Sequence, residues 1–94
     1  PSVNTIDPWV ALAVIVDCKG SAKEISLNEL LTGPRNIGKT FNLDAITMLD
    51  ILYKIEKLGM IKIIRTAGLD IIRILKEVSF QDCVNSYYEN IDKQ

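Results

Sequence analysis

The feature that most constrains the fold is a change of residue pattern after Gly59. Before this glycine, capping signals and apolar spacing are those of helices. After it come two short runs rich in isoleucine, residues 60–65 and 70–76, which are typical of strands. Residues 66–69 between them form a turn in which Gly68 can supply a positive φ angle. The pattern predicts a β-hairpin that follows a group of helices.

Capping residues in the sequence predict where two helices begin and end. The Asp-Pro pair at residues 7–8 supplies an N-cap and a first-turn proline before the wholly apolar run 9–16, and Gly20 can close this helix in the left-handed conformation. Residues 26–29, Ser-Leu-Asn-Glu, form a capping box that begins a second helix of about two turns. The Gly-Pro pair at residues 33–34 ends it. The first helix should be buried on most sides.

A third helix is expected over residues 43–58, with Asn42 as its N-cap. Its roughly periodic apolar positions are expected to face the core: Ile46, Leu49, Leu52 or Tyr53, Ile55 or Glu56, and Leu58. The opposite face is expected to carry a polar stripe: Thr47, Asp50, Lys54 and Lys57.

The order of helix, short helix, longer helix, hairpin and helix is that of a winged helix with an added C-terminal helix. Ile25 is expected to form a very short third strand beside the hairpin. The predicted fold class is therefore α+β and mostly helical. Residues 1–94 are expected to form one winged-helix-like domain, since 94 residues suffice for a single core. The absence of Met at position 1 predicts a fragment of a longer protein.

Composition argues against several classes of protein. No apolar run approaches the ~20 residues that span a bilayer, and no signal peptide is recognisable, so we expect a cytoplasmic protein with no membrane partner. Cys18 and Cys83 stand 65 positions apart in a chain without histidine, which predicts reduced thiols and no metal site. The lack of histidine also removes the usual general base at neutral pH. We expect a domain without catalytic residues or a cofactor.

Residues 33–40, Gly-Pro-Arg-Asn-Ile-Gly-Lys-Thr, match the phosphate-binding loop pattern G-x-x-x-x-G-K-[ST]. In a true loop Lys39 would reach the phosphates and Thr40 would bind Mg²⁺. The true loop follows a buried strand and opens a helix at once. Here it follows the expected second helix, and Phe41 and Asn42 separate it from the third. Nucleotide binding is therefore a distant third hypothesis.

Charge favours a binding surface in the middle of the chain. The net charge is −1, but residues 33–76 carry eight Lys or Arg against four Asp or Glu. In a winged helix the third helix and the wing contact DNA. The candidate DNA-binding residues are Arg35, Asn36, Lys39, Thr40, Asn42, Thr47, Lys62, Arg65 and Thr66. Asp44 and Asp50 on the same helix oppose phosphate binding, so we expect weak, salt-sensitive contact with DNA.

The alternative is a protein-interaction or dimerisation module. Ser79 is expected to cap the last helix, in which apolar residues recur at positions 80, 83, 84, 87, 88 and 91. Such a stripe packs more often into the core than against a partner. The candidate interface residues are Phe80, Tyr87, Tyr88 and Ile91. They could join a homodimer or other subunits of a DNA-modification complex.

Several short motifs resemble a bacterial family of uncharacterised domains associated with DNA phosphorothioation and related defence systems. They are Trp9, residues 26–31 (SLNELL), residues 38–44 (GKTFNLD), residues 66–70 (TAGLD) and residues 86–89 (SYYE). The best-known type in this family is the DNA-nicking component. The resemblance implies that the chain is the C-terminal part of a DNA-acting protein and that any nuclease activity lies in the missing N-terminal part. It places DNA slightly ahead of a protein partner.

Overall fold

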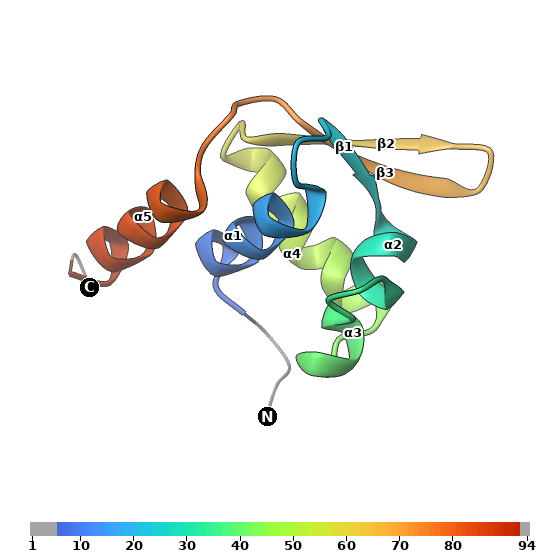
Figure 1. Cartoon of the computed structure of the whole chain (residues 1–94), viewed down its shortest axis with the longest axis horizontal. Coiled ribbons are helices and arrows are strands. Elements are labelled where there is room, and N and C mark those ends of the chain that lie inside the picture. The colour runs from blue at the N-terminus through green and yellow to red at the C-terminus, as the bar shows by residue number, and fades with distance from the viewer. Residues whose placement is uncertain (1–5, 93–94) are drawn as a thin grey trace.

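The computed structural model describes residues 6–92 and has an α+β fold compatible with a winged helix (Figure 1). The elements are α1 (Pro8–Lys19), β1 (Glu24–Ser26), α2 (Leu27–Thr32), α3 (Ile37–Thr40), α4 (Ala45–Lys57), β2 (Ile61–Thr66), β3 (Leu69–Ile74) and α5 (Phe80–Asp92). The outermost parts of the predicted 1–94 domain, residues 1–5 and 93–94, lie outside the described residues.

The three strands form one antiparallel sheet in the order β1-β3-β2. β2 and β3 are the predicted hairpin, and Thr66 lies opposite Leu69 at its tip. β1 pairs with the other side of β3, where Ile25 lies opposite Ile72, so the predicted third strand is confirmed. The hairpin, here called the wing, projects at the opposite end of the molecule from α5 (Figure 1).

One apolar core joins the helices to the sheet. Burial of apolar side chains is the main contribution to the stability of such a small domain. The largest fully buried side chains come from α1, α2, α4, both wing strands and α5. They are Leu12, Ile15, Leu30, Met48, Leu52, Ile55, Ile61, Ile72 and Cys83. The added helix α5 is thus part of the same core through Cys83.

The N-terminus of α4 differs from the prediction. The helix begins at Ala45, and its N-cap is Asp44, whose carboxylate accepts a hydrogen bond from the Thr47 N–H at 2.8 Å. Asn42, the predicted cap, instead has a left-handed backbone with φ 54°. Leu43 between them is 6% exposed, so burying it fixes the turn that precedes the helix. The anionic Asp44 also suits the positive end of the helix dipole.

The buried face of α4 is also rotated from the predicted one. Ile46 is 76% exposed and Leu49 is only half-buried. Met48 and Ile51 face the core in their place, together with Leu52 and Ile55, which were expected to do so. Because α4 is rich in apolar residues, its periodicity allows more than one inward face, and packing against the sheet and α1 selects this one.

Two local features were not expected. The segment between α2 and α4 was predicted as a loop, but residues 37–40 form the short helix α3, which Ile37 anchors with a buried side chain. At the wing tip Gly68 has the predicted positive φ, and Ala67 has one as well, at 47°. Two positive φ angles are required by the two-residue hairpin turn whose twist matches the strands.

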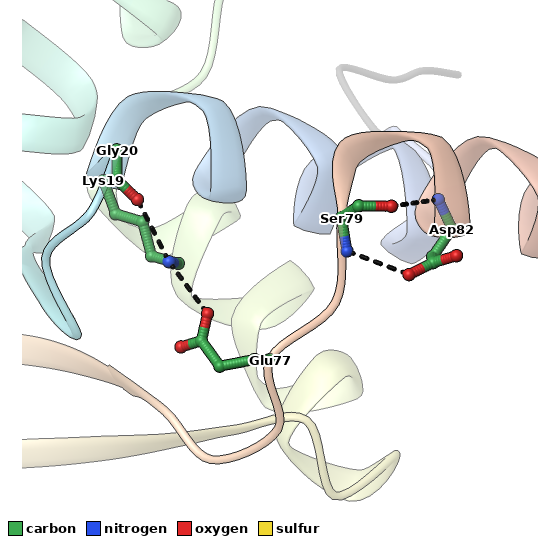
Figure 2. Close-up of polar contacts among 5 residues, drawn as sticks. All are labelled: Lys19, Gly20, Glu77, Ser79 and Asp82. Carbon is green, nitrogen blue, oxygen red and sulfur yellow. Dashed lines mark hydrogen bonds and ion pairs between the residues drawn. The ribbon is translucent and has the colours of Figure 1, made fainter.

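Figure 2 shows how α5 is attached to the rest of the domain. The Ser79 hydroxyl accepts a hydrogen bond from the Asp82 N–H at 3.0 Å, and the Asp82 carboxylate accepts one from the Ser79 N–H at 3.0 Å. This reciprocal arrangement confirms Ser79 as the cap. The Lys19 ammonium donates to the carbonyl of Gly20 at 3.2 Å and lies 3.3 Å from the Glu77 carboxylate. These contacts tie the β3–α5 connection to the end of α1.

Candidate functional site

Both glycines of the phosphate-loop-like sequence have structural roles. Gly33 ends α2, and its N–H donates to the Glu29 carbonyl at 2.7 Å. A Cβ atom at Gly33 would overlap that carbonyl oxygen at less than 3.0 Å, which real Cβ atoms essentially never do. A Cβ atom at Gly38 would lie 3.1 Å from the Leu31 carbonyl oxygen and 3.2 Å from that of Leu43. Close backbone packing therefore accounts for both glycines.

The surroundings of this sequence are not those of a nucleotide loop. It follows helix α2, where the phosphate loop follows a buried strand, and the turn of helix that it opens is only four residues long. The Thr40 hydroxyl donates to the Arg35 carbonyl at 3.3 Å. Lys39 is exposed on the surface of α3. The structure supports the interpretation of residues 33–40 as a connection between α2 and α4 in which two glycines allow close backbone packing.

The predicted DNA-binding residues fall on three parts of the structure. Arg35, Asn36 and Asn42 lie in the connections around α3; Lys39 and Thr40 are in α3; Thr47 is in the first turn of α4; Lys62, Arg65 and Thr66 are in β2. All are exposed except Thr47, which is half-buried. The exposed face of α4 carries Ile46, Asp50, Tyr53, Lys54 and Lys57. Lys54 and Lys57 were not predicted as DNA contacts, although the polar stripe already contained them.

The two arginines in the predicted DNA surface are both ion-paired. Arg35 lies 2.8 Å from the carboxylate of Asp17 at the end of α1. Arg65 lies 2.7 Å from Asp70, the residue opposite it in the wing. The hydrogen bond that Arg65 donates to Asp70 and the negative charge of Asp70, with a smaller contribution from Tyr53 of α4, raise the pKa of Arg65.

The lysines of this region are available to a ligand. Lys39, Lys54, Lys57 and Lys62 are exposed, and no ion pair within 4 Å joins any of them to another residue in the range 6–92. Lys39 lies in α3, Lys54 and Lys57 lie on α4, and Lys62 lies on the face of β2 opposite to the buried Ile61. The cations that remain unpaired are therefore lysines, which bind phosphate as point charges and lack the fork geometry of arginine.

A second candidate surface is an apolar groove between α1 and α5. It has a volume of about 230 Å³ and is lined by Trp9, Val10, Ala13, Val14, Phe80, Cys83, Val84, Tyr87 and Tyr88. Phe80 is 51% exposed and Tyr88 is 61% exposed. The rings of Tyr87 and Tyr88 meet edge to face with their centroids 5.3 Å apart.

The four predicted interface residues therefore divide into two groups. Tyr87 is half-buried, whereas Phe80, Tyr88 and Ile91 are exposed. The general tendency of an apolar stripe to enter the core is followed here by Cys83, which is 1% exposed. The outer part of the stripe remains on the surface, where exposed aromatic side chains are a feature of interaction sites.

The two cysteines are free thiols with little tendency to ionise. Burial raises the pKa of Cys83, and burial together with the Asp17 charge raises that of Cys18. Within residues 6–92 no group of three or more His, Cys, Asp or Glu side chains is placed to hold a metal ion. None of the helices described for this chain is both long and apolar enough to cross a bilayer.

Comparison with known proteins gives one relationship. Neither the curated proteins nor the solved structures include a significant match. A family model for DUF4007, a protein of unknown function, matches residues 1–88. The match extends from before α1 into α5 and so includes every element that builds the two candidate surfaces. The chain therefore belongs to the DUF4007 family.

Proposed function

We propose that this chain is a non-catalytic DNA-binding domain that contacts the phosphate backbone through α3, α4 and the wing. The observation that carries the proposal is the group of exposed, unpaired lysines Lys39, Lys54, Lys57 and Lys62. They belong to the elements that meet DNA in winged-helix proteins. Asn36, Asn42 and Thr66 are exposed close to them along the chain and could add hydrogen bonds to phosphate or base edges.

The same surface argues for weak binding with little sequence discrimination. Arg65 is paired with Asp70, and Arg35 with Asp17, so neither guanidinium is free for bidentate contact with guanine. Asp50 on the exposed face of α4 adds a repulsive charge. Binding would therefore depend on lysine–phosphate attraction, which weakens steeply with added salt because the release of DNA counterions then contributes less free energy.

The resemblance to proteins of DNA phosphorothioation systems supports a role in bacterial defence or DNA modification. In this proposal the domain supplies DNA affinity to a cytoplasmic protein of such a system. Nicking or other catalysis would belong to a different part of that protein. Residues 6–92 lack histidine, and both cysteine thiols have raised pKa values, so this domain offers few groups for nucleophilic catalysis.

The test is fluorescence anisotropy with labelled duplex and single-stranded DNA at about 50 and about 200 mM salt. Four phosphate contacts give a log–log salt slope of about −3.6, so this fourfold increase in salt should weaken duplex binding about 150-fold. In the variant Lys39→Ala/Lys62→Ala two contacts would remain, and the same change in salt should weaken binding about 12-fold.

The matched control is Lys23→Ala/Lys76→Ala, which removes two exposed lysines from the end of the sheet far from the wing tip. It should retain the wild-type salt slope. Absence of binding at tens of micromolar protein and 50 mM salt, or equal losses in the two double variants, would contradict the proposal. A parallel titration with ATP and Mg²⁺ should leave the melting temperature unchanged, and a saturable increase would revive the nucleotide hypothesis.

A second candidate function is docking of a protein partner on the α1/α5 groove. The observation that favours it is the exposure of Phe80, Tyr88 and Ile91 beside that groove. Figure 1 shows α5 and the wing at opposite ends of the molecule, so one domain could hold DNA and a protein at the same time. Replacing Phe80 and Tyr88 with alanine should then abolish partner binding and leave DNA binding intact.

A further inference from the structure

We propose that the α1/α5 groove binds a basic amphipathic helix supplied by a protein partner. This inference rests on the second candidate function above and names the chemistry of the partner. Three properties of the groove support it: the apolar lining, the intervals of three and four residues between the lining side chains of α5, and the negative charge around the groove.

The lining has the chemistry of a helix-binding groove. Trp9 and Val14 of α1 form one wall, and Phe80 and Tyr88 of α5 form part of the other. Half or more of the Phe80 and Tyr88 surface remains accessible, although both belong to the face of α5 that turns toward the core at Cys83. An apolar side chain inserted here would complete the burial of these rings, which are the residue types that contribute most at interfaces.

The spacing of the lining side chains along α5 favours a helix as the inserted segment. On α5 the side chains at positions 80, 84, 87 and 88 recur at intervals of three and four residues along about two turns. A helix laid along such a row presents its own apolar residues at the same intervals, as in other helix-in-groove interfaces. The groove would thus accept anchors at positions i, i+3 or i+4, and i+7 of the partner.

The charge around the groove selects a basic partner. Among the residues that the structure describes, no Lys or Arg lines the groove, and Asp7, Asp82 and Asp92 lie at the ends of the two helices that form it. Asp17 of α1 is paired with Arg35 and so adds little charge to this rim. A partner with Lys or Arg beside its apolar anchors would be attracted to this rim, and complementary charge also favours rapid association.

The same charge argues against a second copy in an α5-to-α5 arrangement. Two-fold symmetry would bring the acidic α5 of one copy against the acidic α5 of the other. Like charges placed together across an interface are costly. A heterologous segment of opposite charge has no such cost.

The experiment uses two designed helical peptides of about 15 residues with identical leucine faces. One carries Lys at the flanking positions and the other carries Glu. Trp9 is the only tryptophan of the chain and lines the groove, so its fluorescence reports on occupancy. The Lys peptide should shift Trp9 emission in a saturable way, and the Glu peptide should bind at least tenfold more weakly.

Two variants locate the binding. Phe80→Ala/Tyr88→Ala should weaken binding of the Lys peptide at least tenfold, and Asp92→Lys should weaken it severalfold. Ile46→Ala/Leu75→Ala removes exposed apolar side chains outside the groove and should bind like the wild type. Circular dichroism and melting curves confirm that each variant is folded.

The outcomes separate this inference from the function on which it rests. Equal binding of both peptides, or tighter binding of the Glu peptide, would overturn the basic-partner inference but leave the groove as a docking site. A concentration-dependent dimer that is lost in Phe80→Ala/Tyr88→Ala would show that a second copy of the chain occupies the groove. This result would also overturn the basic-partner inference and leave the groove as a docking site. Absence of binding by either peptide, or binding insensitive to Phe80→Ala/Tyr88→Ala, would overturn the inference and remove support for docking at this groove.

Discussion

Replacing Gly33 with alanine tests whether close backbone packing explains the phosphate-loop-like sequence. The added Cβ would overlap the Glu29 carbonyl oxygen, and that oxygen also accepts the hydrogen bond from the Gly33 N–H. Relief of the overlap requires the backbone to move, which weakens a bond worth about 1 kcal/mol and adds about 1–3 kcal/mol of overpacking strain. Alanine recovers about 0.4–1 kcal/mol by restricting the unfolded chain.

The expected net loss is about 2 kcal/mol in the free energy of unfolding. For a domain of this size it corresponds to a decrease of about 10 °C in melting temperature. The assay is urea and thermal denaturation followed by circular dichroism. Thr32→Ala, at the same end of α2, is the control and should change stability by no more than ~0.5 kcal/mol. A Gly33→Ala protein as stable as the wild type would refute the packing explanation.

Three further predictions concern single contacts. Glu56→Ala removes the carboxylate that accepts a hydrogen bond from the Ile63 N–H on edge strand β2, so it should cost about 1–2 kcal/mol and speed exchange of that amide; unchanged exchange would contradict this role. Ala67→Gly relieves a left-handed backbone and should stabilise the domain by about 0.5–1 kcal/mol, whereas destabilisation would show that the turn is not strained. Hydrogen bonds from the Thr47 and Ser79 N–H groups lower the pKa values of Asp44 and Asp82 in the folded state. Their stabilisation should be present above the unfolded-state pKa of about 3.9 and be lost as pH falls through the folded-state values. Asp44→Asn/Asp82→Asn should reduce the fall in melting temperature between about pH 6 and pH 3, and an unaltered fall would exclude these caps as its source.

The parts of the fold that could be predicted are those set by local chemistry. Ser26 and Ser79 cap helices because each hydroxyl reaches a backbone N–H three residues later, which depends only on neighbouring sequence. Gly68 marks the wing turn for the same kind of reason. Asn42 and Asp44 are both good local caps, two residues apart. Burial of Leu43 decides between them, and that burial depends on the whole core.

The candidate binding surfaces were less predictable because pairing and exposure are tertiary properties. The Arg35–Asp17 ion pair joins residues from different elements, and the sequence contains no signal for it. The Arg65–Asp70 pair could have been found. A two-residue turn at positions 67–68 places residue 65 opposite residue 70 by counting back along the hairpin. Exposure of Ile46 could not be foreseen because α4 has apolar residues on more than one face.

Because the wing and α5 lie at opposite ends of the molecule, the length of the domain sets the distance between ligands bound at these two ends. The longest dimension is 41 Å, and it runs from α5 toward the wing (Figure 1). Along B-form DNA this length corresponds to about 12 base pairs, slightly more than one helical turn. If the proposed DNA contact aligns this axis with the duplex, the point at which a partner attaches at α5 would lie about one helical turn of DNA from the wing.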